Sequence, residues 1–204
     1  MPVQESISAV ILDRETRGEA SLYMTAFSPE CGLLPLFKRM STKKTSLAPD
    51  LFEEISAQIR APDAANSPVR FLQQYEVLKS RAEISHSYEK LCAACEIAAI
   101  VKLNGANISE TRSLFALLGA ALDGISTSAN TSAVKIKFAY VMAKEQGYAV
   151  REDFFRSLSQ TDRADFATIL KTPAAELDSL RDPSARLYQH LANWLRNNTD
   201  ILLA

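Results

Sequence analysis

The sequence predicts an α+β protein in which a small, closed or nearly closed, five-stranded β-barrel precedes an all-helical C-terminal part. Two observations carry this prediction. Short apolar runs separated by brief turns fill the first 80 residues, which is the pattern of a small barrel. From Ser80 onward, the apolar residues recur with the helical period instead. We therefore expect a barrel domain over residues 1–80 and a helical domain over residues 81–204.

The expected strands differ in how clearly the sequence marks them. The second run alternates, with Leu22, Met24 and Ala26 on one face, as in a half-buried strand. Pro35 in the third run indicates an edge or a bulge. The fourth run fits the spacing of a strand and of a helix, and this alternative stays open. The candidate strands are residues 6–14, 20–28, 33–40, 51–60 and 69–79.

Helical periodicity and capping residues define the C-terminal part. Gly147 is expected to close the third helix, since glycine readily adopts the left-handed conformation found at helix ends. Thr172-Pro173 and Asp182-Pro183 each place a capping residue before a proline, which predicts the starts of two late helices. The first three helices are expected at residues 86–103, 109–122 and 131–146.

The composition is that of an ordinary globular protein. The 204 residues are 47% hydrophobic and 23% charged, which excludes disorder over the whole length. The longest uncharged apolar run has nine residues, at 114–122, whereas a membrane-spanning helix needs about 20. Residues 1–9 have no basic stretch of the kind that starts a secretory signal, and three cysteines suit a reducing compartment. We therefore expect a cytoplasmic protein with no membrane association.

Sequence motifs for catalysis are missing. The chain has no phosphate-binding glycine loop, no H-E-x-x-H zinc motif and no G-x-S-x-G nucleophile elbow. The two histidines have no evident acid–base partner, and the adjacent acids diverge on regular elements. The sequence therefore predicts a protein that is not an enzyme, with no catalytic residues and no cofactor.

A cluster of cations is the strongest candidate for a binding site. Lys38, Arg39, Lys43 and Lys44 lie within seven residues, and no acid occurs from residue 38 to residue 49. Serines and threonines follow the cations, and closely spaced cations with neutral donors suit phosphate groups. These four residues, extended by Arg14 and Arg17 at the first turn, are the predicted nucleic-acid contacts. The alternative is a loop whose charges serve only solubility.

Two further sets of residues leave their role open. Tyr23, Phe27, Phe37 and Tyr75 lie on candidate strands, and we expect most of them in the barrel core. Cys92 and Cys95 share a helix face and resemble half of a metal site. Because their surroundings are small and apolar, we expect buried structural thiols and no metal.

The order of these features resembles the RecO family of recombination mediators. Residues 9–44 resemble the family's start: an apolar strand ending in Gly18-Glu19, a second strand ending in a turn over residues 28–32, and a third leading to the basic loop at residues 38–44. Segments around Phe71 to Leu78, Leu114 to Leu122 and Lys137 to Tyr148 also look like this family. The likeness covers residues 6–148.

The resemblance implies an N-terminal OB-fold barrel and a function in DNA repair. It implies binding to single- and double-stranded DNA, strand annealing and recombinase loading, in association with the nucleoid. The implied partners are RecR and the acidic tail of the single-stranded-DNA-binding protein. Lys135 and Lys137 are candidate anchors for that tail, although a solvated helix face is the simpler interpretation. Many relatives carry a four-cysteine zinc module after the position of Tyr148, where this chain has no cysteine, so no structural zinc is expected.

Two alternative functions stay open, and the charge balance motivates the first of them. The net charge is −1, whereas nucleic-acid-binding domains tend to be basic. A protein-interaction module whose barrel has lost strong DNA binding is therefore the second hypothesis. A thiol or metal sensor that uses Cys92 and Cys95 is the third.

Overall fold

The computed structural model describes residues 4–18, 20–40, 47–62 and 67–204. The chain divides into two compact units. The first consists of residues 1–81 together with 105–115, and the second of residues 82–104 together with 116–204. Residues 105–115, which include the start of a long helix, therefore group with the N-terminal unit.

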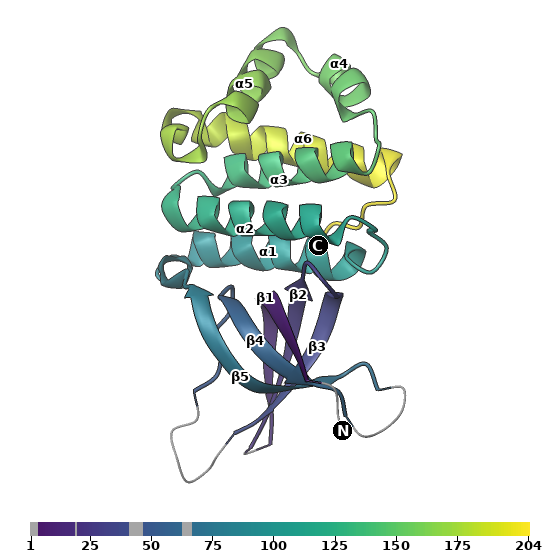
Figure 1. Ribbon diagram of the computed structural model, residues 1–204. Helices are drawn as coiled ribbons and strands as arrows, with labels where there is room; N and C mark the ends of the chain where they lie inside the picture. Colours follow the sequence, from purple (N-terminus) through teal and green to yellow (C-terminus); the bar gives the residue numbers. More distant parts are fainter. Residues whose placement is uncertain (1–3, 19, 41–46, 63–66) are drawn as a thin grey trace. The chain divides into compact units, whose positions relative to one another are not determined.

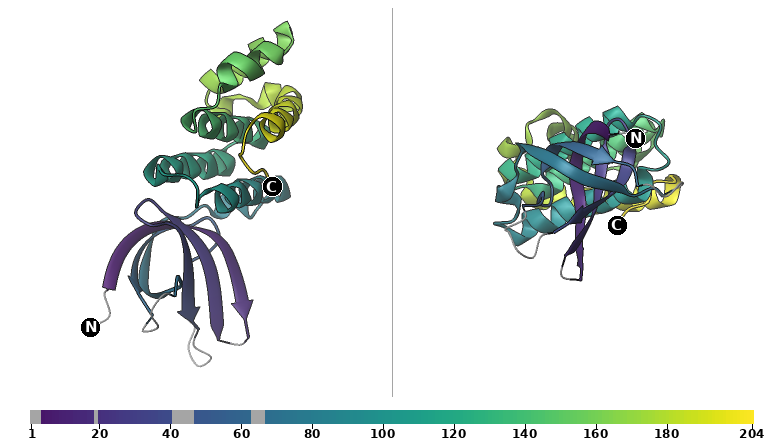
Figure 2. Two further views of the ribbon diagram at one scale, coloured as in Figure 1. Left: turned by 90° about the vertical axis from the view of Figure 1, so that its right-hand side faces the viewer. Right: turned by 60° about the horizontal axis from the view of Figure 1, so that its bottom comes forward.

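A closed five-stranded barrel forms the N-terminal unit, as predicted (Figure 1). The strands follow the order β1-β2-β3-β5-β4 around the barrel and curve strongly as they do so (Figure 2). β3 and β5 pair in parallel, and the remaining pairs are antiparallel. This arrangement is OB-like. The strands are β1 (Gln4–Arg17), β2 (Ser21–Ser28), β3 (Gly32–Arg39), β4 (Glu54–Arg60) and β5 (Arg70–Lys79).

Side-chain alternation separates the barrel interior from its outer face. Leu22, Met24 and Ala26 of β2 point inward, as their spacing predicts, and join inward residues from the other four strands. Burial of these apolar side chains is the main force that closes the barrel. The interior cluster consists of Ile7, Ala9, Ile11, Leu22, Met24, Ala26, Leu34, Leu36, Ile55, Ala57, Ile59 and Leu72.

A buried arginine stabilises the turn that precedes β4. This is the segment for which the sequence allowed both a strand and a helix. Phe52 has a φ of 64°, an uncommon left-handed conformation for a residue with a side chain. The Arg81 guanidinium donates to the Phe52 carbonyl at 2.7 Å and pairs with Glu54 at 3.3 Å. Leu51 and Phe52 form a turn, so β4 begins only at Glu54.

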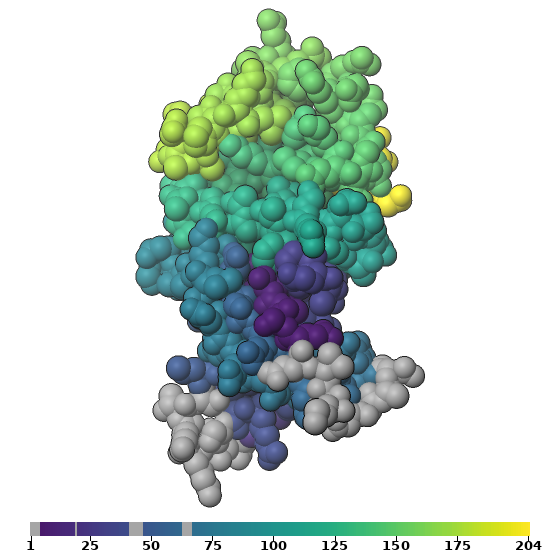
Figure 3. Space-filling view, viewed as in Figure 1, coloured from purple at the N-terminus to yellow at the C-terminus, as the bar shows by residue number. Residues whose placement is uncertain are grey.

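Helices make up the second unit, whereas the start of α2, up to Phe115, groups with the barrel (Figure 1). α3 packs against α1, α5 and α6, and side chains fill the spaces between neighbouring helices (Figure 3). Gly147, at φ 84°, follows α3 as predicted. The helices are α1 (Tyr88–Asn104), α2 (Thr111–Thr127), α3 (Thr131–Glu145), α4 (Phe155–Ser157), α5 (Gln160–Lys171) and α6 (Arg181–Asn198).

The late helices differ from the sequence-based expectation. Pro173 precedes only a single helical turn at Ala174–Glu176, and α6 begins two residues before Pro183. α5 is a helix that the sequence pattern does not predict. It begins after Ser159, whose hydroxyl accepts a hydrogen bond from the Asp162 amide. The apolar positions of α5 are few, since only Phe166 and Ile169 are buried, and this explains the weak periodic signal.

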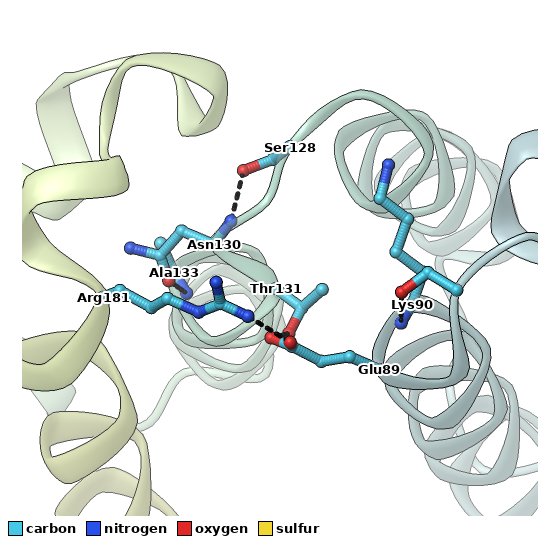
Figure 4. Close-up of polar contacts among 8 residues, drawn as sticks. Glu89, Lys90, Ser128, Asn130, Thr131, Ala133 and Arg181 are labelled. Carbon is cyan, nitrogen blue, oxygen red and sulfur yellow. Dashed lines mark hydrogen bonds and ion pairs between the residues drawn. The ribbon is translucent and has the colours of Figure 1, made fainter.

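A buried polar cluster joins the start of α3 to the chain before and within α6. Figure 4 shows Asn130 of this cluster beside Ser128 and Ala133. The side-chain oxygen of Asn130 accepts a hydrogen bond from the Ala133 backbone amide and caps α3. The side-chain NH2 group of Asn130 donates to the Leu177 carbonyl and to the Ser184 hydroxyl. Asn130 is completely buried. The ion pair between Glu89 and Arg181 lies beside this cluster. Asn130 therefore connects the start of α3 to two distant parts of the helical unit.

No helix in the described residues is both long enough and apolar enough to cross a membrane.

Candidate nucleic-acid interface

Three aromatic rings lie in one row on the outer face of the barrel. Tyr23 of β2, Phe37 of β3 and Phe71 of β5 occupy positions that alternate with the inward residues Leu22, Leu36 and Leu72. All three rings are half-buried. We call Tyr23, Phe37 and Phe71 the aromatic strip.

Strand register brings the three rings together. Tyr23 and Phe37 are partners across β2 and β3, and Phe37 and Phe71 are partners across the parallel pair β3 and β5. The centroids of Tyr23 and Phe37 are 5.1 Å apart, and those of Phe37 and Phe71 are 5.4 Å apart. Both contacts are edge-to-face, the arrangement that the ring quadrupoles favour.

A guanidinium group lies against each end of the aromatic strip. The Arg17 guanidinium of β1 is 4.8 Å from the Tyr23 ring centroid, and the Arg60 guanidinium of β4 is 5.6 Å from that of Phe71. The Arg60 Nε is buried and, within the described part of the chain, has no hydrogen-bond partner. Bound phosphates or waters commonly satisfy such donors. The row of cation, three rings and cation follows the strand order of the barrel.

A hollow of about 580 Å³ lies where β3 and β5 separate. The ladder between these strands has only two residue pairs, which end at Phe37 and Phe71. Lys38 and Arg39 line the hollow together with both rings. Arg39 is exposed, whereas Lys38 is half-buried with its ammonium 5.6 Å from the Tyr75 ring centroid. The remaining lining residues are Ala20, Ser21, Leu72 and Gln73.

The other predicted cations have different surroundings. Lys43 and Lys44 lie outside the described residues. Arg14 pairs with Asp50, and Arg17 pairs with Glu15 at 2.7 Å. The hydrogen bond from Arg17 holds the pKa of the Glu15 carboxyl below its usual value. These two arginines line a second hollow of about 190 Å³ beside Tyr23, but their positive charges are partly balanced by acids.

The aromatic residues considered from sequence do not all lie in the core. Phe27 is completely buried, and Tyr75 packs against the interior cluster. Tyr23 and Phe37 instead belong to the outer face, so the expectation that most would be core residues is wrong. Phe71 and Arg60 are not among the site residues that the sequence predicts. Because side chains alternate along a strand, the inward position of Leu72 indicates that the adjacent Phe71 points outward. That Phe71 lies beside Phe37 follows only from the pairing of β5 with β3.

Lys135 and Lys137 are not on a solvated face. The Lys135 ammonium pairs with Glu96 at 2.8 Å and lies 4.1 Å from the Tyr188 ring centroid. The Lys137 ammonium donates to the Thr172 carbonyl, and burial lowers its pKa. A partner that used these lysines would have to displace contacts within the helical unit.

A pocket of about 310 Å³ on the helical unit carries cations of its own. Rings and aliphatic groups from α3, α5 and the segment between them form its lining, together with Arg151 and Lys171. Both cationic residues are exposed. The other lining residues are Tyr140, Phe155, Phe166, Ala167 and Leu170.

The cysteines differ from their prediction. Cys31, Cys92 and Cys95 are all exposed and none forms a disulfide. Among the described residues, no group of three or more His, Cys, Asp or Glu side chains is arranged to hold a metal ion. Small apolar neighbours predicted burial, but Ala93, Ala94 and Ile97 occupy the buried side of α1 and leave both thiols on the other side.

No protein-family model matches this chain, and no curated protein is significantly similar to it in sequence.

Proposed function

We propose that the barrel binds single-stranded nucleic acid along the aromatic strip. The observation that carries this proposal is the row of three outward rings, with a guanidinium at each end, on an OB-like barrel. In OB folds, the face of the second and third strands and the adjoining loops form the oligonucleotide-binding surface. Tyr23 and Phe37 lie on that face here.

The chemistry of the strip favours single strands over duplexes. Exposed bases stack on aromatic rings, and each stacked base contributes about 1–3 kcal/mol. Base pairing hides those faces in a duplex, so a duplex would meet only the cations. Arg39 and Lys38 beside the strip supply charge for the phosphates. The binding surface therefore combines ring contacts with a small number of ionic contacts.

The wider role that we propose follows the RecO resemblance of residues 6–148. This role is a non-enzymatic recombination mediator that anneals DNA strands and helps to load a recombinase. RecR and the single-stranded-DNA-binding protein would be its partners at the nucleoid. The pocket lined by Arg151 and Lys171 supports a docking site for an acidic tail, since apolar groups lie beside two exposed cations. In this proposal, that pocket replaces Lys135 and Lys137 as the anchor.

Fluorescence anisotropy with labelled oligonucleotides tests the binding proposal. We expect the full-length protein to bind a thymidine oligomer at low salt and to bind a duplex of equal length more weakly. A single-stranded RNA of matched sequence serves as a competitor and shows whether the sugar matters. No anisotropy change with any single strand at micromolar protein would exclude nucleic-acid binding by this barrel.

The second candidate is a protein-interaction module, and the paired arginines favour it. Arg14 and Arg17 each contact a carboxylate, which reduces the positive potential near Tyr23. If the barrel binds no nucleic acid, the pocket beside Arg151 becomes the principal candidate site. Binding of a labelled acidic peptide by a protein that ignores oligonucleotides would support this function.

A further inference from the structure

The two cysteines of α1 form an exposed pair one helical turn apart. Cys92 and Cys95 are both exposed and neither is in a disulfide. Tyr88 precedes Cys92 by one turn on the same helix and is 84% exposed. Its side chain forms a hydrogen bond with Cys92.

The spacing of the pair suits a bridging ion better than a disulfide. Residues three apart on a helix have Cβ atoms about 5–6 Å apart. A disulfide requires a Cβ–Cβ distance of about 3.5–4.5 Å, so an S–S bond would distort α1. Two metal–sulfur bonds of about 2.3 Å each can span the wider gap without distortion.

Coordination number then selects the kind of ion. Zinc in structural sites takes four protein ligands, and no group of even three candidate ligands exists among the described residues. Thiolate ligands select soft ions such as Cu(I). We propose that Cys92 and Cys95 form a two-thiolate site for a soft monovalent cation of the Cu(I) class.

Binding of the cation by the two cysteines involves no change of oxidation state. Both thiols lose their protons, and each sulfur donates an electron pair to the cation. One monovalent ion and two thiols therefore give a bis-thiolate complex with one negative charge and two released protons. No oxidant is consumed, and the site is independent of the nucleic-acid interface proposed for the barrel.

Anaerobic titration of the reduced, full-length protein with Cu(I) in the presence of a chromophoric Cu(I) chelator tests the proposal. We expect the protein to withhold one ion per chain from the chelator. Cys92→Ser and Cys95→Ser should each abolish this binding, since a single thiol does not compete with the chelator. Cys31→Ser removes an exposed thiol elsewhere and should leave the stoichiometry unchanged.

Three outcomes would overturn the proposal. One is a wild-type protein that withholds no Cu(I). Another is unchanged binding by Cys92→Ser or Cys95→Ser. The third is equally tight retention of Zn(II), which would require more ligands than this pair supplies. Circular dichroism of each variant checks that the helical content of the protein is retained, as expected for substitutions at exposed positions.

Discussion

The ring centroids of Tyr23 and Phe37 lie 5.1 Å apart at an interplanar angle of 65°, because the two residues are direct partners across β2 and β3. Phe37 is thereby held between Tyr23 and Phe71 at the centre of the aromatic strip. A ring fixed in this way has little side-chain freedom left to lose when a base stacks beside it. The geometry of the strip thus leads to a set of mutational predictions.

Removal of the central ring should weaken binding to single strands. We expect Phe37→Ala to lower the affinity for a thymidine oligomer by about 5- to 150-fold, the equivalent of 1–3 kcal/mol for one stacked base. Fluorescence anisotropy measures this change. Phe37→Tyr keeps a ring and should stay close to wild type.

Leu78→Ala is the matched control, since Leu78 is an exposed apolar residue of β5 outside the strip. It should leave the affinity unchanged. Equal losses in Leu78→Ala and Phe37→Ala would indicate a general effect on the barrel and would count against stacking on Phe37.

Replacement of the four clustered cations should flatten the salt dependence of binding. Four phosphate contacts on a single strand give a slope of about −0.7 per contact and near −3 in total. The wild-type affinity should therefore fall about 50-fold between about 50 and 200 mM salt. Alanine at Lys38, Arg39, Lys43 and Lys44 should remove most of this slope in a salt titration, whereas an unchanged slope would place the ionic contacts elsewhere.

The buried side chain of Asn130 should contribute substantially to the stability of the helical unit. Asn130→Ala removes the cap of α3 and leaves the Leu177 carbonyl without its amide donor. We expect a loss of about 2–4 kcal/mol in the free energy of unfolding, which combines the cap with an unsatisfied buried group. Urea denaturation measures it. Asn197→Ala, at an exposed position on α6, is the control, and a similar cost there would argue against a special role for Asn130.

Asp162 should make the stability of the helical unit depend on acid pH. Hydrogen bonds from Ser159 and Arg186 lower the pKa of its carboxyl in the folded state. The charged form therefore stabilises the fold above the unfolded pKa of about 4, and this contribution disappears as the pH falls through the lower folded value. Asp162→Asn should lower the melting temperature at neutral pH, and the difference should shrink on acidification. A difference that is constant with pH would contradict this assignment.

The sequence predicted most of the barrel and less of the site. Alternation at Leu22, Met24 and Ala26 identified the inner face of β2, since strand periodicity is local. The link between Phe37 and Phe71 joins residues 34 positions apart through the closure of β3 onto β5, and no local pattern reports such a contact. The neighbours of Lys135 are likewise distant in sequence, which is why a lysine expected on a solvated face pairs with Glu96.

Photocrosslinking tests the central claim most directly. A single strand that carries a photoreactive halogenated uracil would be irradiated with the full-length protein, and the crosslinked peptides would be identified by mass spectrometry. We expect crosslinks at Tyr23, Phe37 or Phe71 of the aromatic strip. A duplex competitor should reduce these crosslinks only weakly. Crosslinks confined to residues 116–204 would contradict nucleic-acid binding by the barrel.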